Sequence, residues 1–312
     1  MTKPLVVSLG DPAGIGPEII AAAWLRREEL DLPDFVVAGG GRIMATVIVS
    51  DGPPCLDGPD GAYRPGQPDR DGAAIASDSL KLATDLVKSG YCSALVTAPV
   101  SKANIAQIDP GFIGQTEFFA DACGLDHHAS VMMLAGPSLK TVPMTVHCAF
   151  ADVPDLLTVE LIVERCRIVA RSLQVDFGIR DPHIAIAGLN PHAGEDGRMG
   201  SEEIEIIAPA IAQLRTEGVN ASGPHPADTL FAPHKRGTYD VAIAMYHDQA
   251  LVPLKALDFD EGVNVTLGLP IVRTSPDHGT AFDIAGKGIA RPDAMIAAIR
   301  MAAEIAERRA AL

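Results

Sequence analysis

Three histidines of this sequence each follow an apolar run that has the pattern of a buried strand. His147 follows Thr141–Val146, His192 follows His183–Leu189, and His247 follows Tyr239–Tyr246. Ligands of open α/β sheets bind beyond the carboxyl ends of the strands, so these imidazoles are expected at one edge. A lone histidine there is more often a hydrogen-bonded core residue, whereas three favour a divalent metal site. Such an ion polarises a hydroxyl or carbonyl group, and Zn²⁺, Co²⁺, Mn²⁺ and Mg²⁺ all suit imidazole ligands.

Basic and amide side chains near these histidines suit an anionic substrate. Lys255, Asn264 and Arg273 follow the third histidine within the same part of the chain. Arginine offers a bidentate fork to a phosphate or carboxylate, and lysine offers a point charge. Each could equally be a surface residue, so the prediction of an anion pocket depends on their proximity to the metal candidates.

Candidate proton acceptors lie in the same regions. Asp228 and Asp248 are near enough in sequence to hydrogen-bond imidazole N–H groups or to act as bases. Lys102 also follows an apolar run, Ser93–Thr97. The sequence does not choose between Lys102 and Asp248 as the group that takes a hydroxyl proton.

Two glycine-rich segments follow predicted strands. The segment Gly10–Glu18 is a turn into a helix, and it suits either a phosphate cradle or a tight turn that needs glycine. The segment from Gly39 has glycine again at Gly41 but reaches Met44 where a dinucleotide fingerprint has its third glycine. This spacing excludes a Rossmann fingerprint.

Apolar runs of four to eight residues alternate with helical patterns, which indicates an α/β fold with largely parallel sheets. We expect a two-lobed α/β/α architecture, with one lobe formed by residues 1–127 and 268–312 and the other by 128–267. Helices are predicted over residues 73–88, about 158–174 and 292–312, and loops over 51–72 and 220–228. Ser201 is predicted as a helix N-cap with Glu202 and Glu203 in the first turn. Solvated positions are expected for the remaining polar-context histidines, His127, His128, His225 and His234.

Composition limits the class of protein. A chain of 312 residues with 47% hydrophobic content can bury a large core, and a net charge of −15 argues against a nucleic-acid partner. Neither a signal peptide nor a membrane span is indicated, so a cytoplasmic protein is expected. The five cysteines contain no C-x-x-C pair and are expected to be reduced thiols. Cys148, beside His147, is a catalytic-thiol alternative that nothing nearby is built to activate.

The segment His278–Pro292 resembles the cofactor loop of the isocitrate and isopropylmalate dehydrogenases, which bind NAD or NADP without a Rossmann fingerprint. Further motifs span nearly the whole chain, in Gly10–Ile19, Leu189–Gly194 and Tyr246–Gln249. Together they are similar to the 4-hydroxythreonine-4-phosphate dehydrogenase family, which acts in pyridoxal 5′-phosphate biosynthesis.

The resemblance implies a role for each matching residue. It implies that His147, His192 and His247 bind the divalent metal. It implies that the phosphorylated substrate is held by Gln115, Thr116, Lys255, Asn264 and Arg273. It implies that NAD or NADP binds at His278, Gly279 and Asp283 of the cofactor loop in the first lobe. It implies that Asn190 and Gly194, beside the predicted metal site of the second lobe, also bind this cofactor. It also implies a homodimer with its active site at the subunit interface.

One position departs from the family pattern. The family usually has His-Thr where this chain has Gln115 and Thr116. Glutamine donates a hydrogen bond to a phosphate or carboxylate but carries no positive charge. The departure affects the identity of the substrate more than the chemistry.

The predicted reaction is a metal-assisted oxidation of 4-phosphooxy-L-threonine by NAD or NADP, followed by decarboxylation to 3-amino-2-oxopropyl phosphate. One alternative is a paralogue that oxidises 4-phospho-D-threonate, 4-phospho-D-erythronate or a dihydrodiol carboxylate. Another is a non-catalytic phosphate- or nucleotide-binding protein, for which the glycine-rich turns would suffice. The second alternative leaves the three strand-end histidines unexplained.

Overall fold

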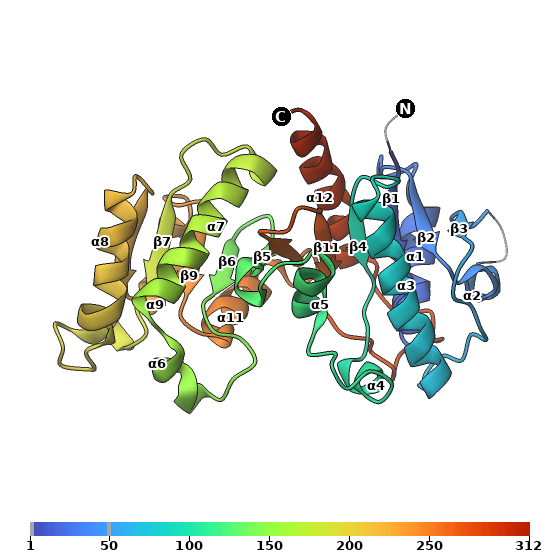
Figure 1. Ribbon diagram of the computed structural model, residues 1–312, viewed down its shortest axis with the longest axis horizontal. Helices are drawn as coiled ribbons and strands as arrows, with labels where there is room; N and C mark the ends of the chain where they lie inside the picture. The colour runs from blue at the N-terminus through green and yellow to red at the C-terminus, as the bar shows by residue number, and fades with distance from the viewer. Residues whose placement is uncertain (1–2, 49–50) are drawn as a thin grey trace. The chain divides into compact units, whose positions relative to one another are not determined.

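The computed structural model describes residues 3–48 and 51–312, and it has the predicted α/β fold with mostly parallel strands (Figure 1). Two compact units make up the chain. The first comprises residues 1–130 and 269–312, and the second comprises residues 131–268. None of the helices within the described ranges is long and apolar enough to cross a membrane.

All strands of the first unit run parallel. Their order is β3-β2-β1-β4-β11. The bounds are β1 (Leu5–Ser8), β2 (Phe35–Ala38), β3 (Cys55–Leu56), β4 (Leu95–Thr97) and β11 (Arg273–Pro276). All four residues of β1 are buried, as expected for a central strand that is covered on both faces.

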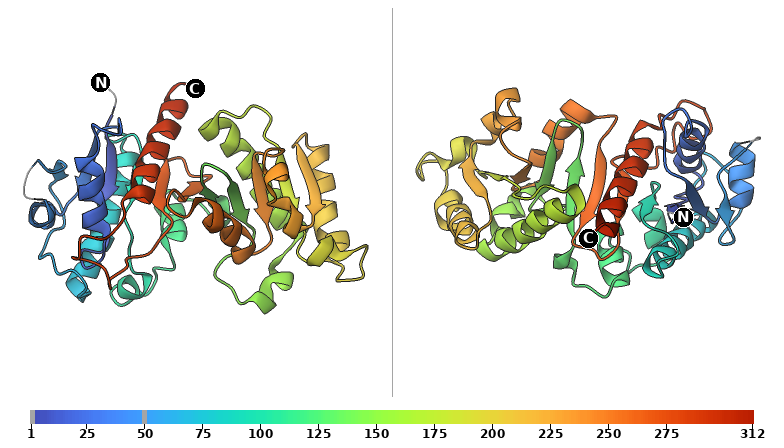
Figure 2. Two further views of the ribbon diagram at one scale, coloured as in Figure 1. Left: turned by 180° about the vertical axis from the view of Figure 1, so that it is seen from behind. Right: turned by 90° about the horizontal axis from the view of Figure 1, so that it is seen from above.

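Helices cover both faces of this sheet. The bounds are α1 (Gly16–Leu25), α2 (Gly41–Val47), α3 (Arg70–Lys88), α4 (Lys102–Ala106), α5 (Gln115–Ala122), the 3₁₀ helix η1 (His127–Ala129) and α12 (Asp293–Ala310). The long α3 lies on one face, and α1 and α12 lie on the other (Figures 1 and 2). Both α3 and α12 were predicted from their apolar periodicity, and both are confirmed.

The sheet of the second unit is mixed. Its order is β10-β5-β6-β9-β7-β8, in which β10, β5 and β6 are antiparallel neighbours and the remaining pairs are parallel. The bounds are β5 (Val131–Ala135), β6 (Lys140–Pro143), β7 (Ile184–Ala187), β8 (Ala221–His225), β9 (Val241–Ala244) and β10 (Val263–Leu267). The carboxyl ends of β6, β9, β7 and β8 therefore lie at one edge.

Two helices, α7 and α11, pack on opposite faces of this second sheet (Figures 1 and 2). The helix bounds are α6 (Val153–Leu156), α7 (Val159–Phe177), α8 (Ala208–Thr216), α9 (Ala227–Leu230), α10 (Pro233–Arg236), α11 (His247–Asp258), the 3₁₀ helices η2 (Phe150–Asp152) and η3 (Pro191–Gly194), and the π-helix η4 (Glu203–Ile207). The hydroxyl of Thr158 accepts from Leu161 N at 3.1 Å and so caps α7, and Gly178 ends the helix with φ of 69°.

Three sequence-based expectations about local structure are wrong. Residues 221–225 form the terminal strand β8 rather than a loop, because an edge strand of this unit can be polar and contain proline. The segment 51–72 contains the short strand β3. Ser201 is not a side-chain cap, since its carbonyl, rather than its hydroxyl, accepts from Ile204 and Glu205 in a π-helical start.

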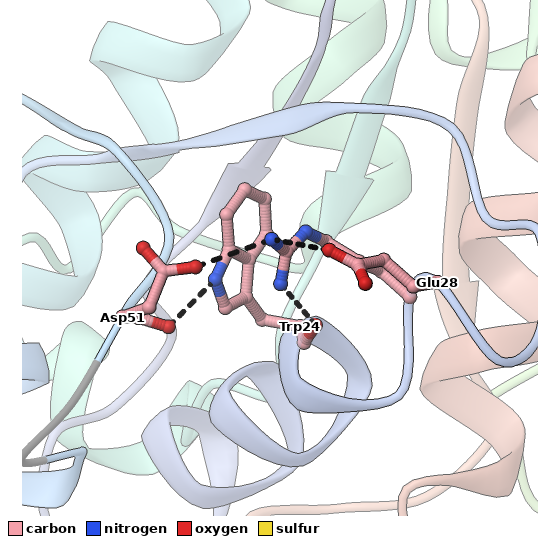
Figure 3. Close-up of polar contacts among 4 residues, drawn as sticks. Trp24, Glu28 and Asp51 are labelled. Carbon is pink, nitrogen blue, oxygen red and sulfur yellow. Dashed lines mark hydrogen bonds and ion pairs between the residues drawn. The ribbon is translucent and has the colours of Figure 1, made fainter.

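The carboxyl end of α1 is anchored by a polar cluster around the single tryptophan (Figure 3). Trp24 Nε1 donates to the Asp51 carbonyl at 2.9 Å, and Arg27 Nη2 bonds the Asp51 carboxylate at 3.2 Å. The Arg27 guanidinium lies 4.0 Å from the centre of the indole ring. The indole N–H is therefore paired although the ring is buried, as burial requires.

Replacing Thr158 tests whether its hydroxyl stabilises the start of α7. Thr158→Ala is expected to lower the free energy of unfolding by about 1 kcal/mol, because the Leu161 N–H loses its acceptor. Urea denaturation followed by circular dichroism measures the change. The matched variant Ser201→Ala should stay within about 0.5 kcal/mol of the wild type, since only its backbone is used. Equal losses in the two variants would contradict the assignment of the cap.

Candidate active site

The three predicted metal-binding histidines lie beyond neighbouring strands. His147 follows β6, His247 begins α11 shortly after β9, and His192 lies in η3 after β7. Because β9 pairs in parallel with both β6 and β7, all three residues follow carboxyl ends at one edge of the second sheet. This is the arrangement that the spacing of the apolar runs predicts.

His147 and His247 lie side by side. Their ring centroids are 6.0 Å apart with planes tilted by 41°, and both rings line a pocket of about 260 Å³. The other lining residues are Thr145, Val146, Cys148, Phe150, Val153, Tyr246 and Asp248. Asp248 Oδ1 lies 2.7 Å from His247 Nδ1. The carboxylate accepts from this nitrogen and leaves Nε2 as the ring atom with a lone pair for a metal ion.

His192 is not gathered with this pair in a single chain. It is exposed on a turn with φ of 52°, and the described part of the chain contains no group of three His, Cys, Asp or Glu side chains close enough to hold a metal ion. The two adjacent imidazoles fit the nitrogen preference of a divalent transition metal. Two of the three predicted metal ligands are therefore adjacent in one chain, and the third, His192, lies on the loop that follows the neighbouring strand.

His225, expected to be solvated, instead belongs to a hydrogen-bonded chain at the end of β8. His183 Nδ1 lies 2.7 Å from the Thr238 carbonyl, and His183 Nε2 lies 2.7 Å from Ser222 Oγ. Ser222 Oγ lies 2.9 Å from His225 Nε2. The carbonyl accepts only, so His183 carries its proton on Nδ1, Ser222 donates to His183, and His225 donates to Ser222.

A buried amide connects two of the strands that precede the histidines. Gln249 Oε1 accepts from Met245 N at 2.7 Å, and Gln249 Nε2 donates to the Gly188 carbonyl at 2.9 Å. Met245 follows β9 and Gly188 follows β7. Gln249 therefore ties together the strand ends that lead to His247 and His192.

In the first unit, Arg273 and Gln115 of the predicted substrate site are in contact. Arg273 Nη2 donates to Gln115 Oε1 and to Thr97 Oγ1, both at 2.7 Å, and its guanidinium lies 5.1 Å from the centre of the Phe119 ring. Burial of this side chain lowers the pKa of Arg273 to about 9. Since the Gln115 oxygen accepts from Arg273, its amide nitrogen is the group left to donate to a ligand.

Lys102 belongs to the same neighbourhood as Gln115 and Thr116. A Cβ atom added at Gly114 would lie 3.0 Å from Lys102 Nζ and 2.6 Å from a Glu117 carboxylate oxygen. Gly114 directly precedes the two substrate candidates, which form the first turn of α5. Glycine is needed here so that the amine can approach this helix start.

The other two substrate candidates belong to the second unit. Lys255 lies half-buried on α11, and Asn264 lies on β10. Asn264 Oδ1 is buried without a hydrogen-bond partner among the residues that the structure describes. A buried acceptor in this state suits a ligand that donates a hydrogen bond. Asp228, a candidate base, is exposed on α9.

The predicted cofactor loop packs on the first glycine-rich turn. Ile15 N donates to the Thr280 carbonyl at 2.9 Å, and a Cβ atom added at Gly14 would lie 2.7 Å from the same oxygen. Glu18 Oε1 accepts from the Gly286 N–H. Gly279 has open space at its Cβ position, and His278 and Asp283 are exposed beside it. The loop is thus bound to the first glycine-rich turn and its helix, and it is exposed at the residues that are expected to contact a nucleotide.

The glycines of the first turn serve close packing. Gly10 has φ of 72°, and a Cβ atom there would lie 2.6 Å from the Pro99 carbonyl. Asp11, which is buried, accepts from Ala13 N at 3.0 Å and from Asn104 Nδ2 at 3.4 Å, and burial raises the pKa of its carboxyl. These contacts support the tight-turn interpretation.

Sequence reasoning missed three polar residues that organise these sites: Thr97, Glu203 and Gln249. Thr97 ends a strand and Gln249 directly follows the His247-Asp248 pair, so both lie where the strand-end argument could have found them. Glu203 was expected only as an acidic residue in the first turn of a helix, and the structure shows it to be 3% exposed. No local pattern distinguishes it from the exposed Glu205.

Comparison with known proteins first gives the class. A crystal structure of isocitrate dehydrogenase from Methylococcus capsulatus shares the fold, with a TM-score of 0.50 at 14% identity over 99% of each chain. The molecule therefore has the isocitrate dehydrogenase-like fold that the cofactor-loop motif predicts.

Closer relatives give the family. The family model described as pyridoxal phosphate biosynthetic protein PdxA matches residues 39–302. The 4-hydroxythreonine-4-phosphate dehydrogenase of Erythrobacter litoralis is 57% identical over 99% of this chain and 98% of its own. The crystal structure of the Klebsiella pneumoniae enzyme of that name superposes with a TM-score of 0.83 at 35% identity, over 98% of both chains. The chain belongs to the 4-hydroxythreonine-4-phosphate dehydrogenase family.

The environment of His225 predicts a pH effect. Burial, followed by the charges of Lys235, His183 and Arg215, lowers the pKa of His225 below its usual value of 6.5. The folded state thus favours the neutral ring, so this contribution to stability is complete above pH 6.5 and is lost as the pH falls through the lower folded-state pKa.

Unfolding free energies measured from pH 8 down to pH 5 should therefore fall less steeply in His225→Asn than in the wild type. Asparagine is polar and does not titrate near neutral pH. The exposed His128→Asn is the control and should leave the slope unchanged. A His225→Asn curve parallel to the wild type would contradict the assigned environment.

Proposed function

We propose that the protein oxidises the secondary hydroxyl of 4-phosphooxy-L-threonine with NAD or NADP and releases CO₂ to form 3-amino-2-oxopropyl phosphate. The observation that carries this proposal is the His147–His247 pair at a sheet edge, with Asp248 on the second ring. A non-catalytic phosphate-binding protein has no need of two adjacent imidazoles in an open pocket.

His147, His247 and His192 would hold a divalent ion, which is Zn²⁺, Co²⁺, Mn²⁺ or Mg²⁺. When bound, the ion acts as a Lewis acid that favours the ionised hydroxyl and stabilises negative charge during loss of CO₂. The proposed active site lies at the interface of a homodimer, as the family resemblance implies, so His192 can come from either subunit. Asp248 orients the His247 ring through Nδ1.

Lys102 is the proposed acceptor of the hydroxyl proton. Asp248 is already engaged with His247, whereas the Lys102 amine lies against the start of α5, beside Gln115 and Thr116. A base must reach the hydroxyl while the substrate is held. Lys102 meets this condition because it lies beside residues that are proposed to hold the substrate. Asp228 is assigned no proton transfer.

The substrate's anionic groups are proposed to bind Arg273, Lys255 and the amides and hydroxyl of Asn264, Gln115 and Thr116. Arg273 remains charged at neutral pH because its lowered pKa is still about 9. The nicotinamide cofactor is proposed to bind along His278, Gly279 and Asp283, with Asn190 and Gly194 completing its site. Hydride transfer belongs to the cofactor, and the protein supplies orientation. This function suits the cytoplasm.

Production of NADH or NADPH tests the proposed function. The purified dimer should generate it from 4-phosphooxy-L-threonine and oxidised cofactor, and a chelator should suppress the rate until a divalent ion is restored. His247→Ala should reduce kcat/KM by at least about 100-fold, while the exposed His128→Ala should not change it. Unchanged turnover in the presence of chelator would contradict a metal-assisted reaction. Faster turnover of 4-phospho-D-threonate or 4-phospho-D-erythronate would identify the paralogous activity instead.

Gln115 gives a second test, on substrate recognition. A neutral amide donor does not titrate, so substrate affinity should show no inflection from this position. Gln115→His adds a group with a pKa of about 6.5, and its KM for the substrate should rise about tenfold between pH 6 and pH 8 as the ring loses its charge.

Steady-state kinetics across this pH range measure the effect. The control Gln107→His adds the same ring at an exposed position after α4 and should follow the wild type. Coincident profiles for Gln115→His and Gln107→His would remove Gln115 from the substrate site.

A further inference from the structure

The turn that carries His192 has an unusual backbone. Six consecutive residues have positive φ, with 52° at His192, 52° at Ala193, 78° at Gly194, 45° at Glu195, 55° at Asp196 and 87° at Gly197. Four of them are not glycine, and L residues visit the left-handed region as single residues rather than as runs. A run of this kind persists only where its surroundings hold it, and such strain is concentrated at functional sites.

A buried carboxylate lies directly against this turn. Glu203 Oε1 accepts from Asn190 N at 2.8 Å, and Oε2 accepts from Asn190 Nδ2 at 3.0 Å. The side chain is 3% exposed. Both oxygens are therefore used to fix the residue that leads into the turn.

Two glycines let this carboxylate approach. A Cβ atom at Gly188 would lie 3.0 Å from Glu203 Oε1, and one at Gly194 would lie 2.6 Å from Oε2. Gly188 follows β7, and Gly194 lies within the left-handed run. Glu203 thus packs between the end of the strand and the middle of the turn.

The base of the turn is fixed to the neighbouring strands as well. Gly188 N donates to the His225 carbonyl at 2.8 Å, and its own carbonyl accepts from Gln249 Nε2 at 2.9 Å. Gln249 also binds Met245 N, next to the segment with His247. Because Gly188 is held on both sides, the carboxylate of Glu203 has a rigid platform from which to hold the turn.

We propose that Glu203 is a positioning residue that holds the left-handed turn so that His192 can bind the divalent ion. It acts through Asn190 and through contact with Gly194, and it does not itself touch the ion. This inference rests on the proposed role of His192 as a metal ligand. Glu203 must be a carboxylate because both of its oxygens accept hydrogen bonds from Asn190. In glutamine an NH₂ group replaces one of these oxygens, and it would face a donor of Asn190 instead of accepting from it.

Metal titration of the dimer tests the inference. Isothermal titration with Co²⁺ should show Glu203→Gln binding about 10- to 100-fold more weakly than the wild type, as expected when support of a metal ligand is lost. The matched control Glu205→Gln changes an exposed carboxylate of the same helix and should bind as the wild type does. His192→Ala measures the loss when the ligand itself is removed.

Amide hydrogen exchange gives a readout that does not depend on metal. Exchange across residues 190–200 should be about tenfold or more faster in Glu203→Gln, with little change in β6, β7 and β9. Asn190→Ala removes the half-buried side-chain donor that binds Glu203 and also Glu202 Oε2 at 2.7 Å, and it should weaken metal binding and speed exchange as Glu203→Gln does. This second variant keeps the test decisive if Glu203→Gln does not fold.

The outcomes separate the inference from the function on which it rests. If His192→Ala binds Co²⁺ like the wild type, the proposed metal role of His192 is wrong. If His192→Ala loses affinity while the folded Glu203 and Asn190 variants keep wild-type affinity and exchange, the inference about Glu203 is overturned. Weaker binding with faster exchange confined to the turn supports it.

Discussion

The parallel alignment of β6, β9 and β7 is the constraint on which the second unit's site depends. Parallel neighbours end at the same edge, so residues far apart in sequence are delivered to one place. His147 and His247 are brought together in this way, and their ring centroids lie 6.0 Å apart. The same alignment delivers the turn with His192 to that edge from β7.

At that edge backbone pairing continues past β6 and β9, from Thr145 N to the Met245 carbonyl at 3.2 Å, and side chains add further hydrogen bonds to backbone groups. Thr145 Oγ1 donates to the Met245 carbonyl at 2.9 Å, and Arg165 Nη1 donates to the Met144 carbonyl at 2.7 Å. Gln249 does the same between β9 and β7. These polar contacts hold backbone segments that lie outside the strands. The residues that lead to the histidines therefore have defined positions.

In the first unit the guanidinium cation of Arg273 is buried. Arg273 lies against Phe119 and donates to the neutral oxygens of Thr97 and Gln115. Burial lowers its pKa only to about 9, so the side chain keeps its charge at neutral pH. The same contact orients the Gln115 amide.

The sequence by itself determined the α/β class, the long helices and the placement of histidines at strand ends, because apolar periodicity and chain order are local properties that one chain displays. It also carried the motifs by which the family is identified. It did not predict the polar edge strand β8, the hydrogen-bonded state of His225, or the burial of Glu203 beside the exposed Glu205. Only the tertiary structure decided these, since each depends on how the chain folds back and what then lies beside the residue: β7 for β8, Ser222 and His183 for His225, and a left-handed turn for Glu203.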